Sequence, residues 1–115
     1  MSEHDTHHEL PQLSAIEARD AIAAGRISSE RLVKACIARV EAVDPAVNAM
    51  VIRDFDTALM QAKDKDRQIR SGDSPGALHG LPVAIKDIQD VAGLPTTWGS
   101  EALRDSRAES DSAIV

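Results

Sequence analysis

Apolar residues recur at helical spacing in three segments of the chain. The first segment begins at Ser14, where Ser-Ala-Ile-Glu has the form of a capping box that satisfies two backbone donors at a helix start. Gly25 stands where a C-terminal helix cap belongs. The pattern therefore predicts a short first helix between these two residues.

The second segment predicts a helix from Ser28-Ser29 to Val43. Its apolar positions are three or four residues apart and form one face: Leu32, Val33, Cys36, Ile37 and Val40. Pro45 disfavours helical geometry at the residue before it, so we expect the helix to end at Asp44.

The third segment predicts a helix capped by Asp54 or Asp56. Charged residues occupy one face, and the other face is apolar: Phe55, Ala58, Leu59, Ala62 and Ile69. Residues 71–76 follow and are rich in Gly, Ser and Pro, which is typical of a loop.

Two apolar runs without helical spacing predict short strands. Residues 47–52 are rich in Val, Ile and Met. Residues 81–87, Leu-Pro-Val-Ala-Ile-Lys-Asp, predict a buried strand with a charged pair at its end. Residues 93–100 are turn-rich, and residues 111–115 resemble a helix start that is cut off in its first turn, so we expect an interrupted domain.

Composition narrows the possible classes of protein. Residues 1–13 are polar without apolar periodicity and predict a disordered arm. The net charge of -6 argues against a nucleic-acid partner, which requires clustered basic residues. Residues 1–9 lack the basic start and apolar run that are typical of a secretory signal, and no apolar run is long enough to span a membrane. Cys36 is the single cysteine and fits a reducing compartment, so we expect a cytoplasmic protein with no membrane association.

No metal or cofactor is predicted. If Met1 is removed, the amine of Ser2 and the imidazole of His4 form a set that binds copper(II) or nickel(II), and incidental binding is the favoured interpretation. Cys36 lies on the apolar face of its helix, where a small buried side chain is favoured over a reactive thiol.

Lys86 is the most informative candidate for chemistry. Burial would lower the pKa of a lysine after a buried strand, and a neutral lysine acts as a base. The alternative is an ion pair with Asp87 or Asp90, which the local pattern alone favours. His79 fits a loop residue bonded to backbone better than a general base, and Trp98 suits an acyl pocket and a core cover equally.

The residues around Lys86 closely resemble the lysine block of the amidase-signature family. They are Gly-Ala-Leu-His-Gly-Leu-Pro-Val-Ala-Ile-Lys-Asp at 76–87 and Asp-Val-Ala-Gly-Leu-Pro-Thr-Thr-Trp-Gly-Ser at 90–100. Residues 25–29, residues 44–49 and the helix after Asp54 also look like that family's N-terminal region. The resemblance runs from about Leu13 to Val115.

The resemblance implies an α/β fold, a mixed sheet covered by helices, of which residues 14–115 form a truncated N-terminal part with about three helices and two short strands. It implies that Lys86 is the catalytic lysine and that Asp87 positions its loop. The family's lysine acts with two serines to hydrolyse a small-molecule amide, without a cofactor. Both serines lie in a downstream Gly-Ser-rich segment that this chain does not contain, and the pair Ser28-Ser29 suits a helix cap instead.

Three functions therefore stay open. The first is an amidase to which this chain supplies only Lys86, completed by the missing C-terminal part of the fold or by a partner chain. The second is the A subunit of a glutamyl-tRNA amidotransferase, which usually carries Asn after its Lys-Asp, whereas this chain has Ile88. The third is an inactive remnant or a partner-binding fragment.

Overall fold

The computed structural model describes residues 9–115, which divide into two compact units. The first unit ends at Pro82 and is called the helical unit here. The second, Val83–Val115, is called the loop unit.

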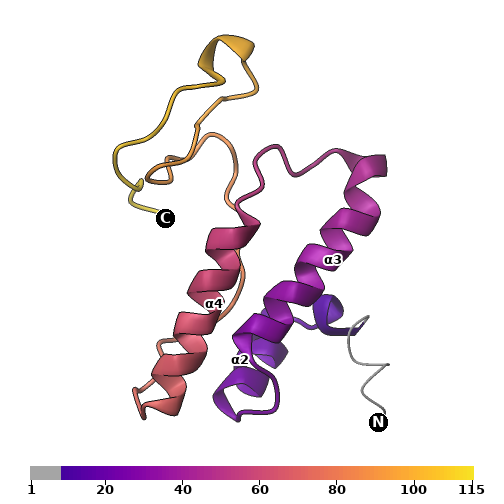
Figure 1. The fold of residues 1–115 in the computed structure, drawn as a ribbon, viewed down its shortest axis with the longest axis vertical. Coiled ribbons are helices and arrows are strands. Elements are labelled where there is room, and N and C mark those ends of the chain that lie inside the picture. Colours follow the sequence, from indigo (N-terminus) through magenta and orange to yellow (C-terminus); the bar gives the residue numbers. More distant parts are fainter. Residues whose placement is uncertain (1–8) are drawn as a thin grey trace. The chain divides into compact units, whose positions relative to one another are not determined.

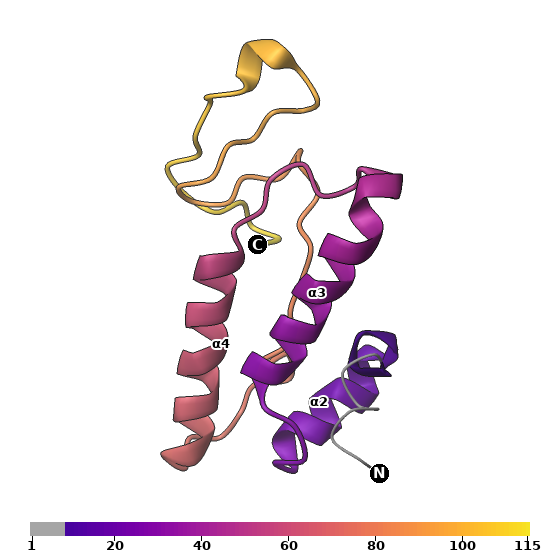
Figure 2. The same ribbon diagram turned by 45° about the vertical axis from the view of Figure 1, so that its right-hand side comes forward.

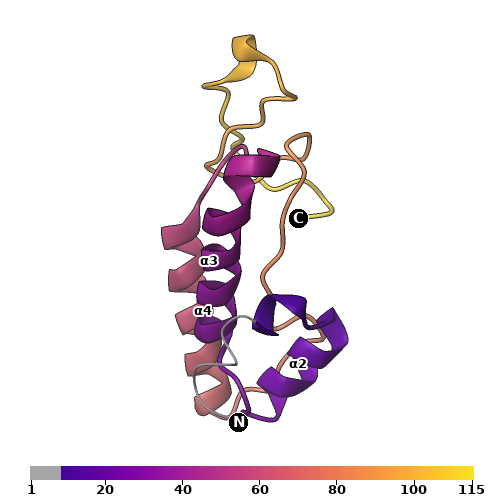
Figure 3. The ribbon, with the colours of Figure 1, turned by 90° about the vertical axis from the view of Figure 1, so that its right-hand side faces the viewer.

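The helical unit contains a short 3-10 helix, η1 (Leu10–Gln12), and three α-helices: α2 (Ala15–Ala23), α3 (Ser29–Val47) and α4 (Phe55–Arg70). The three predicted helices are thus confirmed. Figures 1 and 2 show α3 and α4 side by side, running in opposite directions. Figure 3 shows α2 beside the end of this pair at which α3 begins. None of the described helices combines the length and the apolarity that crossing a bilayer requires.

The core of the helical unit lies where α2, η1 and the first half of α3 meet. Its buried residues are small or aliphatic: Leu10, Ala18, Ile22, Leu32 and Ala35. Cys36 is half-buried against this core, and burial raises the pKa of its thiol. The packing of Cys36 against the core confirms its interpretation as an apolar packing residue.

The start of α2 follows the sequence prediction. The Ser14 hydroxyl accepts a hydrogen bond from the Glu17 amide at 3.2 Å, and the Glu17 carboxylate accepts one from the Ser14 amide at 2.8 Å. At the other end Gly25 has a φ of 71°, the left-handed conformation that ends helices. The capping box and the C-terminal glycine are therefore confirmed.

The predicted polar arm does not extend to residue 13. Leu10–Gln12 form η1, and Leu10 is only 6% exposed in the core. One leucine among polar neighbours carries no periodicity, so only the tertiary packing reveals its burial. Residues 1–8, with the Ser2 and His4 copper-binding set, lie outside the described residues.

The start of α3 is fixed by residues that are distant in the sequence. Ser28 caps the helix as predicted, because its hydroxyl accepts from the Arg31 amide at 3.1 Å. The carboxylate of Asp66, on α4, accepts from the amides of Ser29 at 2.7 Å and Glu30 at 3.0 Å. A carboxylate on two free amides of a helix N-terminus also complements the helix dipole.

The predicted end of α3 at Asp44 is wrong, since the helix continues to Val47 with Pro45 inside its last turn. Asp44 itself secures the longer end. Its carbonyl accepts from the amide of Asn48, which has a left-handed φ of 54°. Its buried carboxylate accepts from the Ala49 amide at 2.7 Å and from Arg53 at 2.6 Å. These bonds offset the steric preference that proline imposes on the residue before it.

The strand predicted over residues 47–52 is also wrong. Val47 ends α3, and the following residues connect α3 to α4. The amides of Ala49 and Met50 bond to the Asp44 carboxylate instead of a neighbouring strand, and Val51 is 68% exposed. Asp54 does precede α4, but its side chain makes no capping hydrogen bond.

The loop unit, orange to yellow in Figure 1, contains no α-helix and no strand within residues 83–115. It has one 3-10 helix, η2 (Glu101–Leu103), and two isolated bridges, Ala92 with Ala108 and Pro95 with Arg107. The buried strand predicted over residues 81–87 is wrong: residues 82–86 are exposed, and Val83 is 78% exposed. Apolar composition predicts a strand only where a neighbouring strand accepts its hydrogen bonds, and the loop unit provides none for residues 83–85.

Candidate functional site

Lys86 opens a turn at the start of the loop unit. Its carbonyl accepts from the Gln89 amide at 2.9 Å. Its side chain lies in an exposed position, so the burial expected for Lys86 is wrong for the described residues. No carboxylate of residues 83–115 forms an ion pair with its ammonium group. The alternative interpretation, an ion pair with Asp87 or Asp90, is therefore wrong.

Asp87 bonds to Thr97 with both carboxylate oxygens. Oδ1 accepts from the Thr97 amide at 2.9 Å, and Oδ2 accepts from the Thr97 hydroxyl. Both hydrogen bonds hold the pKa of the Asp87 carboxyl below its usual range, and the bond from the hydroxyl contributes more than the bond from the amide. The Asp87 carbonyl also accepts from the Trp98 amide at 3.0 Å. Asp87 thus ties residue 97 to the lysine turn, in line with the loop-positioning role expected for it.

Asp90 bonds to the neighbouring threonine. Its Oδ1 accepts from the hydroxyl of Thr96 at 2.7 Å, and its carbonyl accepts from the Ser112 amide at 2.9 Å. Thr96 is the one buried residue of the loop unit. The two aspartates closest to Lys86 in sequence are therefore both bound to the Thr96-Thr97 pair.

Hydrogen bonds, not an apolar core, hold the rest of the loop unit together. Backbone bonds join Gly93 and Leu94 to Ala108, and Thr96 to Ser106, at 2.9 to 3.1 Å. The carboxylate of Asp111 accepts from the Ala92 amide at 2.7 Å. Because each bond joins segments that are about ten or more residues apart, the conformation around Lys86 depends on the whole unit.

Trp98 lies in an unusual conformation beside Thr97. Its φ is 52°, which is rare for a bulky residue, and Gly99 follows with a φ of 72°. The indole is 65% exposed, so Trp98 does not cover a core in its own unit. Of the two roles predicted for Trp98, the acyl-pocket role stays a prediction.

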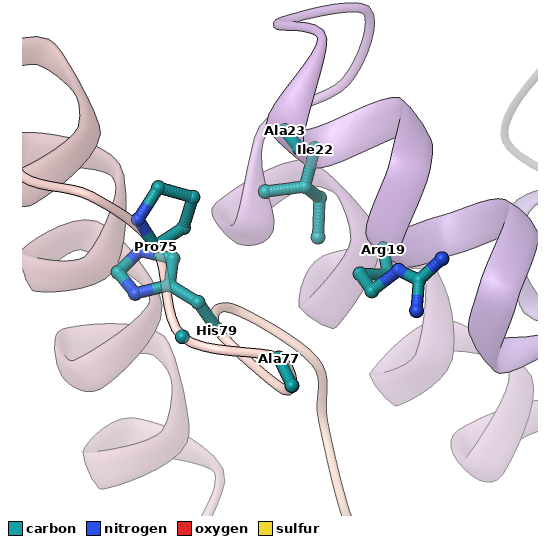
Figure 4. A pocket seen from close by; sticks show the side chains of 7 residues that line it. Arg19, Ile22, Ala23, Pro75, Ala77 and His79 are labelled. Carbon is teal, nitrogen blue, oxygen red and sulfur yellow. The ribbon is translucent and has the colours of Figure 1, made fainter.

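His79 lies in the helical unit and lines a pocket between α2 and residues 75–79 (Figure 4). Its Nε2 donates to the Lys65 carbonyl at 2.9 Å, so the interpretation of a loop histidine bonded to backbone is confirmed. The pocket has a volume of about 260 Å³, which is below the usual range for ligand sites. Its one Lys, Arg, Asp or Glu side chain, Arg19, is paired with Asp20. This pocket therefore has no unpaired charged group to recognise a substrate.

The serine pair at 28–29 lies at the start of α3 and has a structural role there. Ser28 caps the helix, and Ser29 is 1% exposed and donates to the Gly80 carbonyl at 2.6 Å. Neither hydroxyl has a base as a hydrogen-bond partner, so neither is arranged as a nucleophile. No group of His, Cys, Asp and Glu within residues 9–115 is arranged to hold a metal.

Sequence reasoning missed Asp66, Thr96 and Thr97. Each of them bonds to a partner six to 37 residues away. Local spacing does not indicate such pairs, and the only available signal was the position of a Thr-Thr pair in the segment that resembles the amidase-signature family.

Comparisons with known proteins agree on one family. The family model described as Amidase matches residues 31–115. An acylamidase of Rhodococcus erythropolis is 37% identical over 110 residues, which cover 96% of this chain and 23% of that protein. The A subunit of the glutamyl-tRNA(Gln) amidotransferase of Chloroflexus aurantiacus is 37% identical over 107 residues, covering 93% of this chain and 22% of that relative.

A solved structure agrees at the level of the fold. A bacterial aryl acylamidase of the amidase-signature enzymes superposes with a TM-score of 0.80 at 34% identity, covering 84% of this chain and 20% of that chain. The chain spans about a fifth to a quarter of the length of these relatives. The arrangement found here therefore matches part of that fold, and because the family model covers most of its residues, the chain belongs to the amidase family.

Proposed function

We propose that Lys86 is the catalytic lysine of an amide hydrolase. The observation that carries the proposal is that no carboxylate of residues 83–115 pairs with the Lys86 ammonium: two aspartates lie within four residues of Lys86, and both bond to threonines instead. An ion pair would favour the charged form of the lysine, which cannot take up a proton.

The chemistry proposed for Lys86 is general-base activation of a serine. A serine hydroxyl is a weak nucleophile until a positioned base removes its proton. The serine then attacks the amide carbonyl and forms an acyl-enzyme, which water hydrolyses. We propose that the serines and the residues that cover Lys86 lie outside residues 1–115, because the serines at 28–29 serve α3 and residues 82–86 are exposed.

The proposed substrate is a simple carboxylic amide. Support comes from the names of two relatives, an acylamidase and an aryl acylamidase. The A subunit of a glutamyl-tRNA amidotransferase is a second candidate, since that relative has the same 37% identity. Ile88 after Lys86-Asp87 favours the stand-alone amidase, because the amidotransferase chain usually carries Asn there.

Substitution of Lys86 in the complete gene product tests the proposal. We expect Lys86→Ala to lower kcat/KM for an aryl amide by about 100-fold or more, since general bases contribute roughly 10² to 10⁴. Lys65→Ala, which removes another exposed lysine, is the matched control and should leave kcat/KM unchanged. Hydrolysis that survives Lys86→Ala contradicts the proposed mechanism.

Two further measurements separate the competing functions. Ammonia release from glutamine, without aryl amide hydrolysis, identifies the amidotransferase. The nucleotide sequence after the Val115 codon provides an independent test: an open frame that encodes a Gly-Ser-rich segment supports the hydrolase. An immediate stop codon, together with an inactive product, supports a partner-binding fragment.

A further inference from the structure

The Asp87 carboxylate bonds to Thr97 and not to the ammonium group of its neighbour, Lys86. Lys86 and Asp87 are adjacent, yet the Asp87 carboxylate turns to Thr97, ten residues further on. Both of its oxygens accept from Thr97, so the carboxylate is held in one orientation. A freely rotating aspartate would be attracted to the neighbouring ammonium.

We propose that Thr97 is a positioning residue that keeps the Asp87 carboxylate away from the Lys86 ammonium, so that the lysine is free to act as a base. This inference rests on the function proposed for Lys86. Thr97 acts through Asp87 and is not assigned any contact with substrate.

Hydrogen bonds and an unusual backbone conformation fix the loop around Thr97. The amide and hydroxyl of Thr97 donate to the two oxygens of the Asp87 carboxylate. The Thr97 hydroxyl oxygen also accepts from the Gly99 amide at 3.2 Å. The next residue, Trp98, has a left-handed backbone and donates its amide to the Asp87 carbonyl. A left-handed tryptophan is energetically unfavourable on its own, so the surrounding bonds must stabilise it.

The other charged groups of the loop unit are engaged elsewhere or lie in exposed positions. The carboxylates of Asp90 and Asp111 accept from Thr96 and Ala92, and Glu101 pairs with Arg104. Arg107 donates to the Gly93 carbonyl, while Asp105 and Glu109 are exposed. Asp87 is thus the carboxylate of the loop unit that would most favour the charged form of Lys86 if its bonds to Thr97 were lost.

The expected consequence is a change in the pH at which the enzyme becomes active. A base must be neutral, so kcat/KM rises as the pH rises through the pKa of the base. A released carboxylate near the ammonium favours the charged lysine and raises its pKa. Loss of the Thr97 hydroxyl should therefore shift the acidic limb of the profile to higher pH.

The test compares two substitutions at position 97 in the active, full-length protein. Thr97→Val keeps the shape of the side chain but removes the hydroxyl, and we expect the acidic limb of kcat/KM to shift upward by about one pH unit. Thr97→Ser keeps the hydroxyl and should restore the limb to within about 0.3 unit. A Thr97→Val protein that loses rate without any shift of the limb overturns the inference, because a merely structural role predicts that result.

Asp87→Asn decides the matter if Thr97→Val does not fold. With the carboxylate already held by Thr97, we expect the limb to move by less than about 0.5 unit. A fall of about one unit or more would show that the carboxylate acts on the ammonium in the native protein, which overturns the inference. In the Asp87→Asn, Thr97→Val double variant the limb should return toward its native position, because no carboxylate remains to be released.

The two proposals fail in different ways. If Lys86→Ala retains activity, the function proposed for Lys86 is wrong. If Lys86→Ala is inactive and both Thr97 variants keep the native pH profile, the function proposed for Lys86 stands and the role of Thr97 is wrong.

Discussion

Gly80 shows how closely the chain packs against the start of α3. Its φ is +79°, and a Cβ placed on it would lie 3.1 Å from the Ser29 Cβ and 3.5 Å from Ile22. Its carbonyl accepts the buried Ser29 hydroxyl at 2.6 Å. A side chain at position 80 would therefore strain the backbone and push against a tightly packed contact at the same time.

Three glycines separate these two effects. We expect Gly80→Ala to lower the free energy of unfolding by about 2 kcal/mol or more, from backbone strain and crowding together. Gly72→Ala, which has a positive φ but open space around it, should cost only about 1 kcal/mol.

Gly76→Ala has open space and no left-handed φ, so we expect a change within about 0.5 kcal/mol. Urea denaturation of the native protein and the three variants measures the differences. If Gly80→Ala and Gly72→Ala lower the free energy of unfolding equally, crowding against Ser29 does not contribute to the destabilisation.

Among the elements, α3 and α4 are joined by polar bonds as well as by packing. Asp66 is buried on α4, although aspartate is a poor helix former. Its two bonds to the first amides of α3 explain its presence, because those amides have no partner within their own helix. The end of one helix is thus fixed by a side chain from another.

Asp66→Ala should therefore destabilise the helical unit. We expect a loss of about 2 kcal/mol, because two amides at a helix start lose their acceptor. Asp64→Ala, on the same helix, removes only an exposed pair with Arg67 and should cost less than about 0.5 kcal/mol. Denaturant unfolding followed by helical circular dichroism compares the two, and equal losses would contradict the capping role of Asp66.

For the whole molecule, the two units differ in what stabilises them. The helical unit has an aliphatic core, whereas the loop unit has one buried residue and is held by hydrogen bonds. The segment 83–85 leads into Lys86 and is exposed, although Val83 and Ile85 are apolar. The amides of residues 83–85 have no acceptor within the loop unit, so hydrogen bonds of that unit do not hold this segment.

Amide hydrogen exchange on the chain of residues 1–115 tests this difference. The amides of Val83, Ala84 and Ile85 should exchange at close to the rates of an unstructured peptide, since no acceptor of their own unit pairs with them. The amides of Leu32 and Val33, buried in α3, should be protected. Full protection of residues 83–85 would contradict our interpretation of this segment.

The sequence by itself determined the three helices, because periodicity and capping residues are local properties of the chain. It also identified the lysine block through a combination of residues that resembles one family. The tertiary structure decided everything that depends on distant partners. Residues 47–52 and 81–87 looked like strands, yet a strand requires a neighbour, and the described chain supplies other acceptors or none. Likewise, Lys86 and Asp87 looked like an ion pair, and only the approach of Thr97 directs the carboxylate elsewhere.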